Sequence, residues 1–240
     1  MAFDFARSRL GLLLPFAGLA VLVIIHGVYW AVVAGGIDER AEAWIAAQER
    51  AGYTIEHQGL EVDGYPFRFT LRAEAPVITA PANEGGWRAD LERVAATAQF
   101  YNLNHWIVTL GGPARVAVDG PDGPAVYAVE AELARLSFAA SAGATTRVGG
   151  DLDLVTLSAL SGPAPAVEAV RLVRLSGFID ADDRFNFALE ARDLQLAESA
   201  MAPEVRAAFG GAAELARMAG ALTDWSILAG VGDPFAWTGA

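Results

Sequence analysis

The sequence predicts a mainly β protein with helices: an N-terminal transmembrane helix is followed by a curved antiparallel β-sheet meander, with a C-terminal amphipathic helix packed on it. Three observations predict this fold class. Residues 10–37 carry no formal charge and are largely apolar, residues 53–194 alternate apolar and polar side chains between Gly- and Pro-rich turns, and residues 203–222 carry an apolar stripe at helical spacing.

The N-terminal segment is predicted to be a membrane anchor. A helix needs about 20 apolar residues to cross a bilayer, and residues 10–37 exceed that length. Arg7 and Arg9 precede the span and acidic residues follow it, so the positive-inside rule leaves residues 1–9 in the cytoplasm and exports the rest.

A cleaved signal peptide is the competing interpretation. The apolar run of a signal peptide is normally shorter, about 7 to 15 residues. The best cleavage site here is after Ala34, and it matches the A-x-A pattern weakly because Val32 occupies the third position before the cut. Tyr29 and Trp30 fall where an aromatic belt meets the outer headgroups, which favours retention. His26 lies close to the same interface, where a neutral imidazole reaches water, so we assign it no functional role.

Residues 38–52 are predicted to form a juxtamembrane helix that continues or restarts the anchor. Asp38 can cap its start and Gly52 can end it. Ala41 and Trp44 share one face, which offers Trp44 to a neighbouring element.

Residues 53–240 are predicted to form an exported β-rich domain. After Gly64-Tyr65-Pro66, the side chains of Phe67, Phe69 and Leu71 point one way and the intervening residues point the other. This alternation indicates a hairpin with one solvent-exposed face. Further strands are predicted over residues 87–98, 106–110, 114–118, 127–138, 147–157, 167–175 and 185–194. The Gly-Pro pairs at residues 112–113 and 162–163 and the turn at 119–124 separate several of them. Residues 203–222 are then predicted to form the helix, whereas residues 225–240 show no obvious partner.

Charge and composition exclude several classes of partner. Arg7 and Arg9 are two of the 17 basic residues and Asp4 is one of the 29 acidic ones, so the part after residue 37 carries a net charge of −13. Such a surface repels phosphate backbones, and we expect no nucleic-acid partner. The chain has no cysteine, which excludes disulfides, thiolate metal ligands and a lipid-modified N-terminal cysteine.

Residues suited to catalysis or metal binding are few. The only histidines are His26, His57 and His105, and no hydrolase, zinc-protease or phosphate-loop motif is present. The acidic group Asp180, Asp182 and Asp183 lacks the spacing of a calcium loop and is typical of a hairpin turn. We therefore expect no catalytic residues, no metal and no cofactor.

Several of these segments resemble a known bacterial family. They are the anchor ending in Tyr29-Trp30, the helix from Asp38, the Gly64-Tyr65-Pro66-Phe67 turn, Trp87 and the segment around His105. Together they resemble domain of unknown function 2125. The resemblance implies a single-pass inner-membrane protein with a periplasmic β-rich domain and brings no catalytic residues. It also implies further strands after residue 222, so we expect this chain to be a fragment or a C-terminally shortened member.

One set of aromatic residues is the candidate site. We expect a face that binds an apolar ligand or a partner, and the residue pattern leaves open whether it is a groove or a filled core. Its residues are Trp44, Tyr65, Phe67, Phe69, Trp87 and Trp106. The leading hypothesis is a protein that shelters a lipid in envelope maintenance. The alternative is an assembly scaffold that docks an envelope protein through Trp44 and a sheet edge, and an enzyme ranks last.

Overall fold

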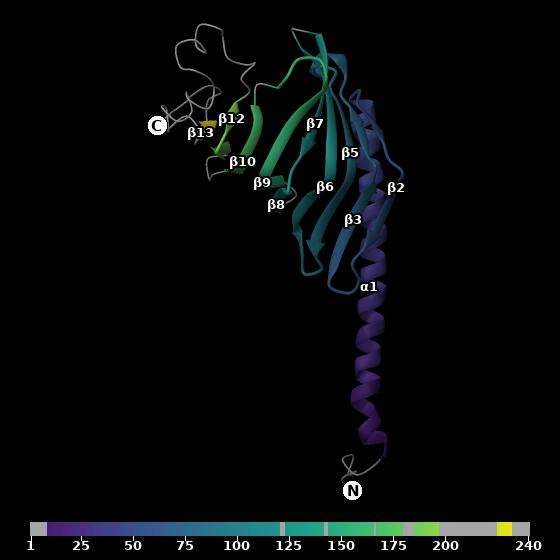
Figure 1. The fold of residues 1–240 in the computed structure, drawn as a ribbon. Coiled ribbons are helices and arrows are strands. Elements are labelled where there is room, and N and C mark those ends of the chain that lie inside the picture. Colours follow the sequence, from purple (N-terminus) through teal and green to yellow (C-terminus); the bar gives the residue numbers. More distant parts are fainter. Residues whose placement is uncertain are drawn as a thin grey trace.

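The computed structural model describes residues 9–120, 123–141, 144–165, 167–179, 185–196 and 225–231. These residues form one long helix, one short 3-10 helix and a single sheet of 13 strands, in which every pair is antiparallel (Figure 1). The mainly β fold with an N-terminal apolar helix is confirmed. The elements are α1 (Arg9–Arg50), β1 (Thr54–Glu56), β2 (Gly59–Asp63), β3 (Arg68–Glu74), β4 (Val77–Thr79), η2 (Ala82–Glu84), β5 (Arg88–Gln99), β6 (Asn102–Gly120), β7 (Gly123–Glu130), β8 (Leu133–Ser141), β9 (Ala144–Ser161), β10 (Val167–Ile179), β11 (Phe185–Arg192), β12 (Gln195–Leu196) and β13 (Trp225–Val231).

Helix α1 runs without interruption from the apolar segment into the juxtamembrane segment. Asp38 lies inside this helix, so it does not cap a new one as we expected. The helix ends as predicted near Gly52, whose φ of 99° is the left-handed conformation that glycine adopts most easily. Figure 1 shows the N-terminal half of α1 projecting beyond the sheet, while the C-terminal half lies beside β2 and β3.

The strand order of the sheet is β1-β4-β5-β6-β7-β9-β10-β11-β13, with β2 on β3, β3 on β5, β8 between β6 and β9, and β12 on β10. Two predictions of where one strand ends and the next begins are wrong. Gly112-Pro113 does not end a strand, because β6 passes through it where the β5–β6 register shifts. The predicted strand over 127–138 is instead two strands, β7 and β8, which pair with different parts of β6.

The strand register places apolar residues on one face of the sheet. Residues directly opposite in an antiparallel pair point to the same side, so the registers can be followed from strand to strand. One row is Phe69, Ala98, Trp106, Phe138, Val148, Gly177 and Phe187. The next row is Leu71, Ala96, Val108, Leu136, Gly150, Leu175 and Leu189. Both rows consist only of apolar side chains and glycine, so we call this side the apolar face.

The opposite face is polar. The row beside the second apolar row is Arg72, Ala95, Thr109, Arg135, Asp151, Arg174 and Glu190. Asp151 lies between two arginines there, 2.9 Å from Arg135 and 3.1 Å from Arg174. The alternation seen at Phe69 and Leu71 therefore extends across the sheet to β11.

Helix α1 covers only one end of the apolar face. Among the described residues, Phe69 is the one large side chain that is fully buried, and it packs in a cluster with Ala34 and Ile37 of α1. Farther along the face, Leu175 remains 38% exposed. The predicted helix at 203–222 lies outside the described residues. The described helix that packs on the sheet at Phe69 is α1. The segment at 225–231, for which the sequence showed no partner, pairs with β11.

Candidate apolar groove between helix and sheet

A hollow of about 640 Å³ lies between α1 and the covered end of the apolar face, and we call it the helix–sheet groove. Its walls come from the helix on one side and from β3, β5, β6 and β8 on the other. The lining residues are Val33, Ile37, Arg40, Ala41, Trp44, Leu71, Ala96, Leu103, Trp106, Val108 and Phe138.

Helical and strand periodicity together build this groove. Val33, Ile37, Ala41 and Trp44 recur at intervals of three or four residues, which places them on one side of α1. Leu71, Ala96 and Val108 are consecutive members of one row of the apolar face. Ala41 and Ala96 have small side chains, and we attribute the space between helix and sheet partly to them.

The groove has one charged residue in its lining, Arg40. The indole N–H groups of Trp44 and Trp106 are the other side-chain donors of the lining, and Trp106 Nε1 donates to the carbonyl oxygen of Leu103 at 2.9 Å. The interior of the groove is therefore apolar, with a single cation at its helix side.

The six aromatic residues of the predicted site lie in four places. Trp44 and Trp106 line the helix–sheet groove. Phe69 lies in the adjacent core under Trp30, with ring centroids 5.4 Å apart. Tyr65 and Phe67 are 50% and 70% exposed at the turn between β2 and β3. Trp87 contacts Tyr53 instead, with ring centroids 6.3 Å apart, and it does not line the groove.

Sequence reasoning missed several lining residues. Val33, Ile37 and Arg40 belong to the segment that we assigned to the anchor or to a separate helix, and Phe138 lies on a distant strand. The helical spacing of Ile37, Ala41 and Trp44 across the boundary at residue 38 was the signal that could have found the first group. Phe138 depends on the pairing of β8 with β6, which no local pattern reveals.

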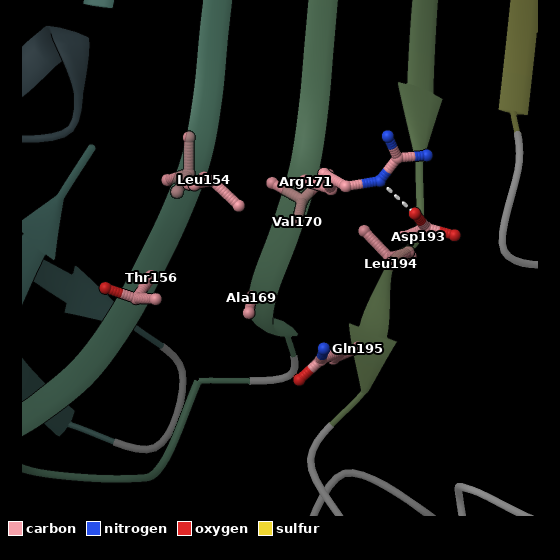
Figure 2. Close-up of a pocket in the computed structure, with 9 residues that line it drawn as sticks. Leu154, Thr156, Ala169, Val170, Arg171, Asp193, Leu194 and Gln195 are labelled. Atoms are coloured by element: carbon pink, nitrogen blue, oxygen red, sulfur yellow. Dashed lines mark hydrogen bonds and ion pairs between the residues drawn. The ribbon is translucent and has the colours of Figure 1, made fainter. Parts of the chain in front are cut away.

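Two further hollows lie along the sheet. One of about 240 Å³ includes Leu110, Ala134 and Leu152. Another of about 620 Å³ lies at β9, β10 and the segment before β12, and it includes Val155, which also lines the smaller hollow. Figure 2 shows this hollow with the ion pair between Arg171 and Asp193 at its side. Apolar residues thus continue away from α1, although charged residues also line both hollows.

The titratable residues of the described part form no cluster suited to metal binding: it contains no group of three or more His, Cys, Asp or Glu side chains so arranged. His57 and His105 are both exposed. Hydrogen bonds from Arg135 and then Arg174 lower the pKa of Asp151, and the hydrogen bond to Glu84 raises the pKa of Tyr53. Asp180, Asp182 and Asp183 lie outside the described residues.

The fold and the groove define a β-rich protein built on a long apolar N-terminal helix. By length and composition, α1 is the one helix in the described residues that can cross a membrane, and its most apolar window has a mean hydropathy of 2.2. Membrane anchors and signal sequences both have this character. Residues 30–240 match DUF2125, described as an uncharacterized protein conserved in bacteria, and the chain belongs to this family. Neither the curated proteins nor the solved structures contain a significant match.

Proposed function

We propose that this protein is retained in the bacterial inner membrane by α1 and that its periplasmic sheet binds the acyl chains of a lipid on the apolar face. The helix–sheet groove is the primary site, and the protein acts by binding and sheltering its ligand rather than by catalysis. This role belongs to envelope lipid transport or maintenance.

The packing of α1 supports its retention. Trp30 covers Phe69, and Ala34 and Ile37 are buried against the same cluster. Cleavage after Ala34 would remove Trp30 and Ala34 from the core of the folded domain. A discarded signal sequence has no need of such packing, whereas an anchor that is part of the fold requires it.

The character of the groove supports a lipid ligand, and this single observation carries the proposal. Its volume of about 640 Å³ is in the range of small-molecule sites, and ten of the eleven lining residues are apolar. The apolar rows continue beyond α1 to β11, which suits a chain-like ligand longer than the groove. Arg40 is positioned to attract an anionic headgroup while the chains lie along the sheet.

Filling the groove tests this function. Ala96 lines the groove, whereas its neighbour Ala95 lies on the polar face. Full-length protein carrying Ala96→Trp should copurify with less phospholipid by mass spectrometry than the wild type, while Ala95→Trp should retain the wild-type amount. Circular dichroism would verify that both variants fold. Equal lipid content in both variants, or no lipid in the wild type, would contradict the proposal.

A second candidate function, an assembly scaffold, is favoured by the exposure of Trp44. This side chain is 57% exposed although it lines the groove, and exposed tryptophan is common at the centre of protein interfaces. A photoreactive residue at position 44 should then crosslink one specific envelope protein in cells. Recovery of lipid adducts alone would remove this alternative.

A further inference from the structure

Two turns of the sheet lie against α1 inside its uncharged stretch. The β2–β3 turn contributes Tyr65, Pro66 and Phe67, and the β5–β6 turn contributes Phe100 and Tyr101. The two turns are joined by the hydrogen bond from the Phe100 amide to the Phe67 carbonyl oxygen, at 3.2 Å. We call the exposed residues Tyr65, Phe67 and Tyr101 the aromatic tip.

Side chains of α1 hold both turns in place. His26 Nε2 donates to the Pro66 carbonyl oxygen at 2.7 Å, and Tyr29 donates to the Phe100 carbonyl oxygen at 3.2 Å. The ring of Tyr65 lies 5.8 Å from that of His26. The turns therefore sit at the height of residues 26–30 on the helix.

The length of the helix places this height at the outer edge of a bilayer. An α-helix rises about 1.5 Å per residue, so His26 lies about 26 Å and Trp30 about 32 Å from Arg9 along the axis. The hydrocarbon core of a bilayer is about 30 Å thick. With Arg9 at the cytoplasmic boundary, the two turns reach the periplasmic headgroup boundary.

The exposure and charge of the tip suit that environment. Tyr65, Phe67 and Tyr101 are 50%, 70% and 75% exposed, although large aromatic side chains gain most from leaving water. Neither residues 64–68 nor residues 100–103 include an acid, in contrast to the acidic exported part as a whole. Arg68, next to the tip, has no carboxylate partner among the described residues.

We propose that the aromatic tip is embedded in the outer-leaflet interface of the membrane that α1 crosses. Aromatic side chains concentrate at that depth, and Arg68 meets lipid phosphates there. This inference rests on the proposed anchoring by α1. This placement also gives the groove an entrance, because Leu103 and Trp106, which follow the β5–β6 turn, line the groove. An acyl chain then passes from the leaflet to the apolar face without crossing water.

Depth-dependent fluorescence quenching tests this placement, because the chain has no native cysteine. Full-length single-cysteine variants Phe67→Cys and Tyr101→Cys would be labelled with an environment-sensitive dye. They would then be reconstituted into vesicles of phosphatidylethanolamine and phosphatidylglycerol. Two control positions are Leu19→Cys in the span and Asn83→Cys in η2, at the opposite end of the sheet. The quenchers are aqueous iodide and two lipids, one with a nitroxide on its upper acyl chain and one with a nitroxide near the chain end, because position 19 lies about 15 Å from Arg9, at the bilayer centre.

The expected result is loss of emission with the nitroxide lipid at positions 67 and 101, and no such loss at position 83. Iodide quenching at 67 and 101 equal to that at 83, with position 19 still quenched by lipid, would overturn the placement of the tip and leave the anchor intact. If position 19 also fails to respond to lipid, the anchoring function itself is wrong, and the inference fails with it.

Discussion

The indole ring of Trp30 stacks on the phenyl ring of Phe69, with centroids 5.4 Å apart and an angle of 16° between their planes. Trp30 Nε1 also donates to the carbonyl oxygen of the neighbouring Arg68 at 3.0 Å. One side chain of α1 thus contributes both an apolar and a polar contact to β3. This relationship makes the N-terminal helix a structural part of the sheet domain.

Removing the Phe69 ring should be strongly destabilising, because Phe69 is 0% exposed and its loss leaves a cavity under Trp30. We expect Phe69→Ala to lower the free energy of unfolding by about 3–5 kcal/mol, as for other buried phenylalanines. Urea denaturation followed by circular dichroism would measure it. Phe178→Ala is the matched control, since that ring is 48% exposed and lies outside the aromatic tip, and a similar loss in both variants would contradict the assigned packing.

Gly64 is required by the β2–β3 turn. Its φ is 103°, and a Cβ at this position would lie 2.8 Å from the Arg68 carbonyl oxygen. Gly64→Ala should therefore destabilise the domain by about 1–3 kcal/mol. Gly59→Ala, where a Cβ would meet no atom within 4 Å, should be close to neutral. Thermal denaturation of the two variants side by side checks this, and equal melting temperatures would refute the assigned backbone strain.

Local patterns predicted much of the fold, because strand alternation and helix hydropathy are set by neighbours in the chain. Phe69 and Leu71 identified the apolar face of β3 correctly, whereas Phe67, which we placed on the same face, lies in the turn before β3 and is 70% exposed. The groove was not predictable in the same way, since Trp106 and Phe138 become neighbours only through the pairing of β6 with β8. Pro113 was misleading for a physical reason: proline normally ends a strand, but a register shift in the β5–β6 pair accommodates it.

Arg40 should select the headgroup of the bound lipid. It is the only charged residue in the groove lining, so Arg40→Gln should reduce the proportion of anionic phospholipid that copurifies while leaving the total lipid bound largely unchanged. Lipid mass spectrometry of the full-length protein measures both quantities. Arg50→Gln, at the end of α1 and outside the lining, is the control. An unchanged lipid composition in Arg40→Gln would argue against this role.

Asp151 should add a small, pH-dependent contribution to stability. Hydrogen bonds from Arg135 and Arg174 lower its pKa in the folded protein, so its stabilising effect is complete above the unfolded pKa of about 3.9 and is lost as the pH falls through the lower folded value. At pH 7, Asp151→Asn should cost no more than about 1 kcal/mol, because both arginines are solvent-exposed.

The measurement is urea denaturation of the wild type and Asp151→Asn at neutral and strongly acidic pH. The difference between them should shrink in acid. Glu61→Gln, on strand β2, serves as the control. A difference that grows as the pH falls would show that the sign is wrong.

The most direct measurement of the central claim is photocrosslinking from two adjacent positions of β6 in intact bacteria. Val108 lines the groove on the apolar face, and Thr109 lies on the polar face. With a photoreactive phenylalanine analogue at each position in turn, we predict phospholipid adducts from position 108 and none from position 109. Equal labelling at the two positions, or no lipid adduct from position 108, would contradict the conclusion that the apolar face holds acyl chains.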